Sequence, residues 1–127
     1  DPRWQANYDL IYAQLVAYQA RMWEYSAALE AFVKKPPAVP LAKPPDLRLI
    51  HWNVTVRSQT LTMESRPYIE RASELFRIVM DNHPGTPWAG RAHGELQRGF
   101  GVDFVPEYRR PSPWSGPSDQ LKPIPKL

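Results

Sequence analysis

The stretch that decides the fold is residues 4–33, WQANYDLIYAQLVAYQARMWEYSAALEAFV, which contains neither proline nor glycine. Large apolar residues recur in it at alternating steps of four and three: Trp4, Tyr8, Ile11, Leu15, Tyr18, Met22, Tyr25, Leu29 and Phe32. An unbroken repeat of this kind over four heptads predicts a helix whose one face packs along another helix. Because Pro36 and Pro37 stop a helix, we expect a long amphipathic helix over residues 1–35.

The positions beside this stripe carry few charges. In a self-standing coiled coil they are usually Glu and Lys, whereas here they are Tyr12, Gln14, Gln19, Arg21, Ser26 and Ala28. A second apolar row is formed by Leu10, Val16 and Trp23. A helix with two apolar faces is expected to lie between partners. Two interpretations stay open: the core helix of a bundle, or a seam through which the chain self-associates.

The next segments are extended. Residues 36–48 are predicted to form a proline-rich linker. Lys34, just before it, fits a ligand pattern of aromatic-groove domains together with Pro37 and Pro40. Residues 49–62 form a strand or extended segment, because Ile50, Trp52, Val54 and Val56 alternate with polar residues. No second strand is evident, so this segment is expected to lie against the helices or to pair with a part of the protein outside this chain.

Residues 66–100 are predicted to form a helical hairpin. Pro67 can occupy the first turn of a helix that ends before Pro84-Gly85. Thr86 followed by Pro87 is a typical helix start, and Gly99 suits the end of that second helix. Residues 101–127 are predicted to be a proline-rich tail, which either wraps over the helices or serves as a recognition arm; its candidate anchors are Phe104, Tyr108 and Trp114.

Two resemblances extend this interpretation. Ala72, Phe76 and Pro84 match the A-x3-F…P half of the tetratricopeptide repeat, which implies a helical hairpin of that type. RWQANYDLIYAQLVAY (residues 3–18), HPGTPWAGRAHGELQRGFGVDF (83–104) and PIPKL (123–127) together resemble the C-terminal region of large bacterial proteins with an upstream von Willebrand factor A domain. This second resemblance implies an accessory helical region of an envelope or periplasmic assembly. The metal-binding Asp-x-Ser-x-Ser signature of that domain is absent here, so no functional residue is carried over.

The composition argues against several classes of protein, namely nucleic-acid-binding, disulfide-linked and membrane-spanning ones. The net charge is only +3 and no dense basic stripe is present, so we expect no nucleic-acid partner. Without cysteine there is no disulfide and no thiolate metal site. No apolar run approaches the ~20 residues of a membrane span. Because the chain opens with Asp1-Pro2 rather than Met, we expect it to be a piece of a longer or processed protein.

Catalytic signals are weak. His83 and His93, with Asp81 or Glu95, are the candidate ligands of a small metal-dependent enzyme, but the His-Glu-x-x-His motif is absent. The glycines do not follow the spacing of a nucleotide-binding loop. We therefore expect neither an enzyme nor a cofactor.

The sequence as a whole predicts a single, mainly α-helical domain that acts as a non-catalytic scaffold or assembly module. It would dock on another protein, on domains of its parent protein or on a second copy. The expected anchors on the long helix are Trp4, Ile11, Leu15, Tyr18, Met22 and Tyr25. The alternative is a tetratricopeptide-type module that binds a peptide in a groove faced by Trp88, Arg91 and Gln97.

Overall fold

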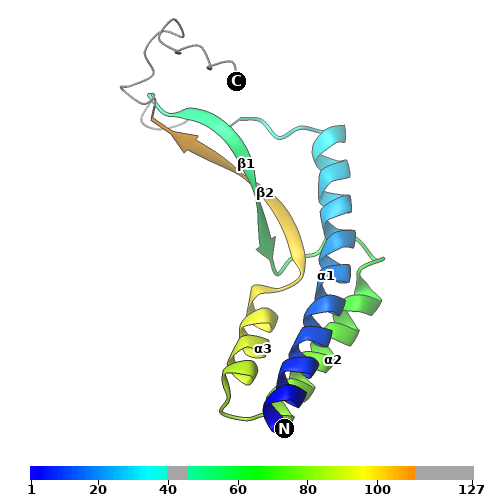
Figure 1. Ribbon diagram of the computed structural model, residues 1–127. Helices are drawn as coiled ribbons and strands as arrows, with labels where there is room; N and C mark the ends of the chain where they lie inside the picture. The colour runs from blue at the N-terminus through cyan, green and yellow to red at the C-terminus, as the bar shows by residue number, and fades with distance from the viewer. Residues whose placement is uncertain (40–45, 111–127) are drawn as a thin grey trace, which may run out of the picture. The chain divides into compact units, whose positions relative to one another are not determined.

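The computed structural model describes residues 1–39 and 46–110, and this part of the protein is mainly helical, as the sequence predicts. Its elements are α1 (Pro2–Lys34), β1 (Arg48–Arg57), α2 (Arg66–Asn82), α3 (Pro87–Arg98) and β2 (Gly101–Arg109) (Figure 1). The chain divides into two compact units. The first, Asp1–Ala38 with Val54–Val105, holds all three helices, and the second is Val39–Asn53 with Pro106–Leu127. Pro40 of the predicted linker motif, and Trp114 with the rest of the tail beyond Arg110, lie outside the described residues.

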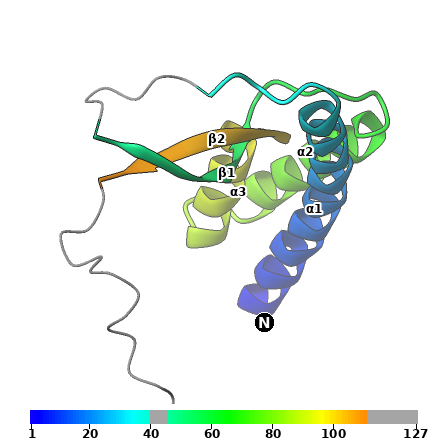
Figure 2. The same cartoon turned by 90° about the horizontal axis from the view of Figure 1, so that it is seen from above.

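In the helical unit, α2 packs against both α1 and α3, whereas α1 and α3 make few contacts with each other (Figures 1 and 2). Phe76 and Val79 of α2 are completely buried between them. The core is built from the following residues: Leu10, Ala13, Val16, Ala17, Ala20, Ala72, Leu75, Phe76, Val79, Ala92 and Phe100.

The face of α1 that packs in this core is not the stripe of large apolar residues. It is a row of mostly small residues, namely Ala6, Leu10, Ala13, Ala17, Ala20, Glu24 and Ala28. The prediction that the large stripe packs along another helix of this chain is therefore wrong for most of its length, since Trp4 and Tyr18 are 74% and 55% exposed. The physical reason is that small side chains let two helix backbones approach closely, so an alanine face packs well although each residue buries little area.

The helix ends follow ordinary capping chemistry. Asp1 Oδ1 accepts a hydrogen bond from the Arg3 amide at 3.0 Å at the start of α1. Thr86 caps α3 as predicted, because its hydroxyl accepts from the Ala89 amide at 3.3 Å. Gly85 has φ +72° in the turn between α2 and α3, a conformation that favours glycine.

Most of the segment predicted as a strand or extended segment, residues 49–62, belongs to β1, which ends at Arg57 and forms a two-stranded antiparallel sheet with β2 (Figure 1). The expectation that no second strand is present in this chain is therefore wrong, because the segment predicted as an extended, proline-rich tail begins with β2. The sequence of this segment does not predict a strand readily, because it contains Pro106 and proline is not expected in a central strand. In a sheet of two strands, however, both strands are edges, where proline is tolerated.

In the second unit, polar side chains join the two strands. Asn53 Nδ2 donates a hydrogen bond to Glu107 Oε2 at 2.6 Å, and Arg109 Nη2 lies 2.9 Å from Glu107 Oε1. The hydrogen bond from Asn53, followed by that from Arg109, lowers the pKa of Glu107 below its ordinary value. These contacts are on exposed side chains and stabilise the pairing modestly.

Candidate functional site

The most unusual surface of the helical unit is one face of α1. Six large apolar residues on it are between 47% and 74% exposed: Trp4, Tyr8, Ile11, Leu15, Tyr18 and Met22. We call these six residues the open face. Five of them are anchors that the sequence predicts. Contiguous apolar exposure of this kind marks an interaction site far more often than an isolated exposed residue does.

The open face carries no charge. Between Trp4 and Leu29 the charged residues of α1 are Asp9, Arg21 and Glu24, and none of them is exposed. The remaining exposed side chains of this segment are amide, hydroxyl or apolar: Gln5, Asn7, Tyr12, Gln19, Trp23, Ser26 and Leu29. On α1 itself a partner would therefore meet apolar and uncharged polar groups, and the charged side chain that reaches Tyr12 from α2 is Arg71.

A groove of ≈ 740 Å³ lies over the C-terminal part of the open face. Its walls are Tyr12, Leu15, Val16, Tyr18, Gln19, Met22 and Trp23 of α1, together with Tyr68 of α2. At its N-terminal end the rings of Tyr8 and Tyr12 stack, with centroids 6.5 Å apart and planes 10° apart. The groove is therefore lined mainly by aromatic and aliphatic side chains, as apolar ligand sites are.

Tyr25, the sixth predicted anchor, is not part of the open face. Its ring centroid lies 5.9 Å from that of Phe104, and Phe32 lies 5.2 Å from the same ring. Both tilted pairs are within the range of favourable aromatic contacts. The heptad stripe is thus divided: Tyr25 and Phe32 in its C-terminal part contact Phe104, whereas the part up to Met22 is uncovered. Phe104, one of the candidate tail anchors, packs against α1, which fits the first of the two interpretations of the tail.

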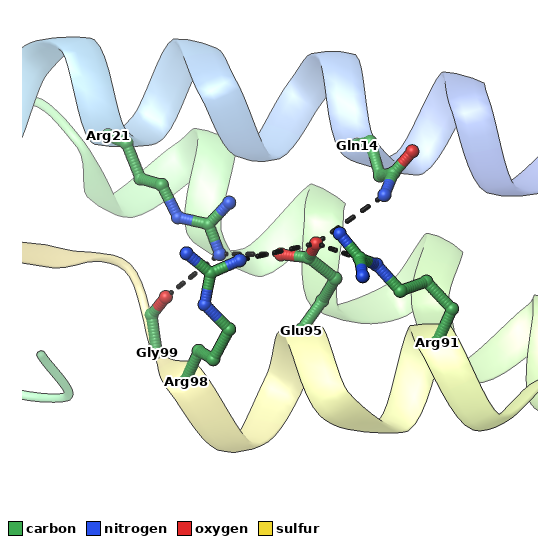
Figure 3. A network of polar contacts seen from close by, with 6 residues as sticks. All are labelled: Gln14, Arg21, Arg91, Glu95, Arg98 and Gly99. Atoms are coloured by element: carbon green, nitrogen blue, oxygen red, sulfur yellow. Dashed lines mark hydrogen bonds and ion pairs between the residues drawn. The ribbon is translucent and has the colours of Figure 1, made fainter. Parts of the chain in front are cut away.

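A buried ion pair joins α1 and α3 (Figure 3). Arg21 Nη2 lies 2.8 Å from Glu95 Oε2 and donates a second hydrogen bond to the Gly99 carbonyl at 3.0 Å. Gln14 Nε2 donates to Glu95 Oε1 at 3.4 Å. The guanidinium of Arg21 also lies 5.5 Å from the centre of the Phe100 ring. This network joins two helices that otherwise make few contacts.

Two exposed arginines of α3 surround the same carboxylate. Arg91 and Arg98 each approach Glu95 Oε1 to 3.6 Å (Figure 3). Desolvation acts to raise the pKa of Glu95, but the hydrogen bond and charge of Arg21, with smaller contributions from Gln14 and Arg98, outweigh it. The pKa of Glu95 therefore lies below its ordinary value, and the carboxylate stays ionised at neutral pH.

A second buried carboxylate, Glu24, belongs to the alanine face of α1 and is completely buried. It accepts hydrogen bonds from the amides of Leu61 and Thr62, at 2.7 and 3.3 Å, and from the Ser65 hydroxyl at 2.5 Å. Ser65 is the residue before α2, and its hydroxyl makes no cap to the helix itself. Glu24 therefore fixes the chain that leads into α2 to the middle of α1.

The other candidate residues have separate surroundings. Trp88 is half-buried and packs against the core, while Arg91 reaches Glu95 and Gln97 is exposed. His83 Nε2 lies 3.0 Å from Asp9 Oδ2, and His93 is exposed on α3. Within residues 1–39 and 46–110, no three His, Asp or Glu side chains gather as a metal site would require.

The sequence interpretation did not include Glu24, Tyr68 or the Arg21–Glu95 pair in the site. A signal for Glu24 existed, since it lies in the same 4-3 register as the five alanines of the buried face. A charged residue in such a row must find partners when it is buried. No comparable signal marks Tyr68, which reaches the groove from another helix.

We compared the chain with protein-family models, with curated proteins and with solved structures, and no match was found. The two resemblances stated from the sequence therefore stay predictions. Of the helices in the described part of the chain, none combines the length and apolarity that a membrane crossing requires.

Proposed function

We propose that this protein is a non-catalytic scaffold or assembly module that docks on a protein partner through the open face of α1. One observation carries the proposal: six large apolar side chains, each about half exposed or more, form a continuous uncharged surface on one helix. At roughly 200 Å² for a large side chain, they expose on the order of 700 Å². The largest apolar patch of a typical monomer is about 300–600 Å².

Covering the open face with a partner is also energetically favourable. Burial of apolar surface contributes about 25 cal/mol per Å², so covering the open face provides a large favourable term for association. The groove offers a concave site for a protruding side chain, which is where the strongest contacts of protein interfaces concentrate. In this proposal the module belongs to a larger bacterial assembly, as the resemblance to regions that follow von Willebrand factor A domains implies.

The buried carboxylates support a structural role over a catalytic one. Glu24 and Glu95 are the buried acidic residues of the core, and each holds two segments of the fold together through several hydrogen bonds. The tetratricopeptide-type alternative receives less support, because Trp88 packs against the core. A peptide groove of that type also needs about three repeats.

A test of the docking function compares the purified chain with a Leu15→Glu variant. We expect the unaltered chain either to self-associate or to bind the apolar dye ANS, and Leu15→Glu to reduce whichever is observed. Val33→Glu is the matched control, because Val33 is an exposed apolar residue of α1 that lies well beyond Met22, the last residue of the open face. A chain that is monomeric in light scattering and binds no dye would contradict the proposal.

A further inference from the structure

The absence of charge on the open face decides which partner fits it. A symmetric pair of copies brings the same surface of each copy together, so any exposed charge there meets its own kind. From Trp4 to Leu29 no exposed residue of α1 is charged. The charged side chain that reaches Tyr12 from α2, Arg71, is already paired with Glu74 at 2.9 Å. A highly charged partner would instead leave its charged groups without counter-ions on this surface.

The spacing of the open face also fits its own reversed copy. When two helices run antiparallel about a twofold axis near position 13, residues equally distant from that position oppose each other. Trp4 then faces Met22, Tyr8 faces Tyr18 and Ile11 faces Leu15, and the second copy repeats the three pairs. All six residues are used, and every one of them is exposed in the single chain.

The groove adds a structural reason for this register. Its walls run from Tyr12 to Trp23, on the half of the open face that lies opposite Trp4 and Tyr8 of a reversed copy. Trp4 is the most exposed large apolar residue of the described chain, at 74%. A groove of ≈ 740 Å³ accommodates its indole ring. Each copy thus offers both a protruding ring and a hollow to receive one.

We infer that the open face binds the open face of a second copy of this chain in antiparallel orientation, with Trp4 of each copy in the groove of the other. The inference rests on the docking function proposed above and names its partner. The exposed area of the six residues, on the order of 700 Å² per copy, approaches the roughly 800 Å² per partner of a standard stable interface. Tyr25 and Phe32, covered by Phe104, lie outside the paired region.

Sedimentation velocity of the whole chain over a range of concentrations tests this inference. We expect the unaltered chain to dimerise. Leu15→Glu and Ile11→Lys should each weaken dimerisation on the order of 100-fold, because each places an unpaired charge in an apolar interface. Circular dichroism of each variant checks that the helices are intact, which is expected because both residues are exposed in the single chain.

An equimolar mixture of the two variants tests the orientation. In the antiparallel pair the introduced carboxylate lies opposite the introduced ammonium, so the mixture should dimerise about tenfold or more tightly than either variant alone. Leu29→Glu is the matched control: it adds the same charge to an exposed apolar residue of α1 beyond the paired region, and dimerisation should not change.

Four results would overturn the inference. A mixture that does not restore dimerisation would contradict the antiparallel register, as would a strong loss with Leu29→Glu. A chain that is monomeric at all concentrations and binds ANS would contradict the second copy as partner but leave the docking function standing. A monomer that binds no ANS would contradict both.

Discussion

Arg21 of α1 and Glu95 of α3 form a 2.8 Å ion pair in which the two side chains are 10% and 3% exposed. The pair lies where α1 and α3 approach each other without extensive apolar packing. Two charges removed from water are stable only when they are paired and further hydrogen bonded. Gln14 and the Gly99 carbonyl provide those additional bonds.

Removal of Glu95 should therefore destabilise the fold strongly. In a Glu95→Ala variant the buried guanidinium of Arg21 loses its carboxylate, and we expect the free energy of unfolding to fall by about 3–5 kcal/mol. Urea unfolding followed by circular dichroism measures this change. Glu30→Ala is the control, because it removes the exposed Lys34–Glu30 pair and should change stability by less than about 0.5 kcal/mol. Equal effects of the two variants would show that the buried pair has no special role.

The same carboxylate should make stability depend on acid pH. The pKa of Glu95 is lower in the folded chain than its ordinary value of 4.5, so the folded state binds its proton less readily than the unfolded state. The stabilisation is therefore fully present above about pH 5 and is lost as the pH falls through the folded-state pKa. Urea unfolding between about pH 7 and pH 3 should show a steeper decline for the unaltered chain than for Glu95→Gln. Parallel curves for the two proteins would contradict this assignment.

How much of this fold the sequence predicts depends on the kind of signal. The helices are marked by caps and breakers close in sequence, such as Thr86 before α3, and these local signals predict the three helices. The pairing of β1 with β2 depends on segments about 50 residues apart. Pro106 makes β2 hard to predict, because proline is tolerated only in edge strands. Whether residues 101–109 form an edge strand becomes clear only when the sheet is known to have two strands.

The candidate site, like the fold, is predicted only in part by the sequence. The 4-3 spacing predicts that five of the six residues of the open face bind a partner, and in the structure these residues are exposed on one helix face. The same spacing cannot show that the alanine row packs in the core instead, because both rows repeat at helical intervals. Which row is buried depends on how closely α2 approaches, and that distance is a tertiary property. Tyr25 illustrates the limit, since Phe104 covers it from a distant strand.

Glu24 should be as important to the entry into α2 as Glu95 is to α3. Glu24→Ala leaves the amide of Leu61 and the buried hydroxyl of Ser65 without their acceptor, and we expect a loss of about 2–4 kcal/mol in unfolding free energy. Hydrogen exchange in the native state gives a local measurement, because the Leu61 amide should exchange faster. Ser65→Ala removes only one donor, so a change of about 1 kcal/mol is expected. An unchanged Leu61 exchange rate in Glu24→Ala would contradict the role of this hydrogen bond.

Two glycines after α3 should resist substitution because another backbone segment lies against them. A Cβ atom at Gly101 would lie 1.8 Å from the Gln59 carbonyl oxygen, and one at Gly99 would lie 2.6 Å from the Ser58 Cα. Gly99 also has φ +77°, which disfavours any other residue. We expect Gly101→Ala and Gly99→Ala each to lower the unfolding free energy by at least about 2 kcal/mol in urea titrations.

Gly90 provides the opposite case within the same region of the chain. It lies inside α3, and a Cβ atom there would meet no atom within 4 Å outside its own helix turns. Alanine favours a helix interior over glycine by about 0.5–1 kcal/mol, so Gly90→Ala should raise the unfolding free energy by that amount. Each of the three glycine-to-alanine variants adds one methyl group. Comparison of their unfolding free energies therefore distinguishes the effect of backbone crowding from that of helix propensity. A loss of stability in Gly90→Ala would show that a neighbouring backbone occupies this side of α3.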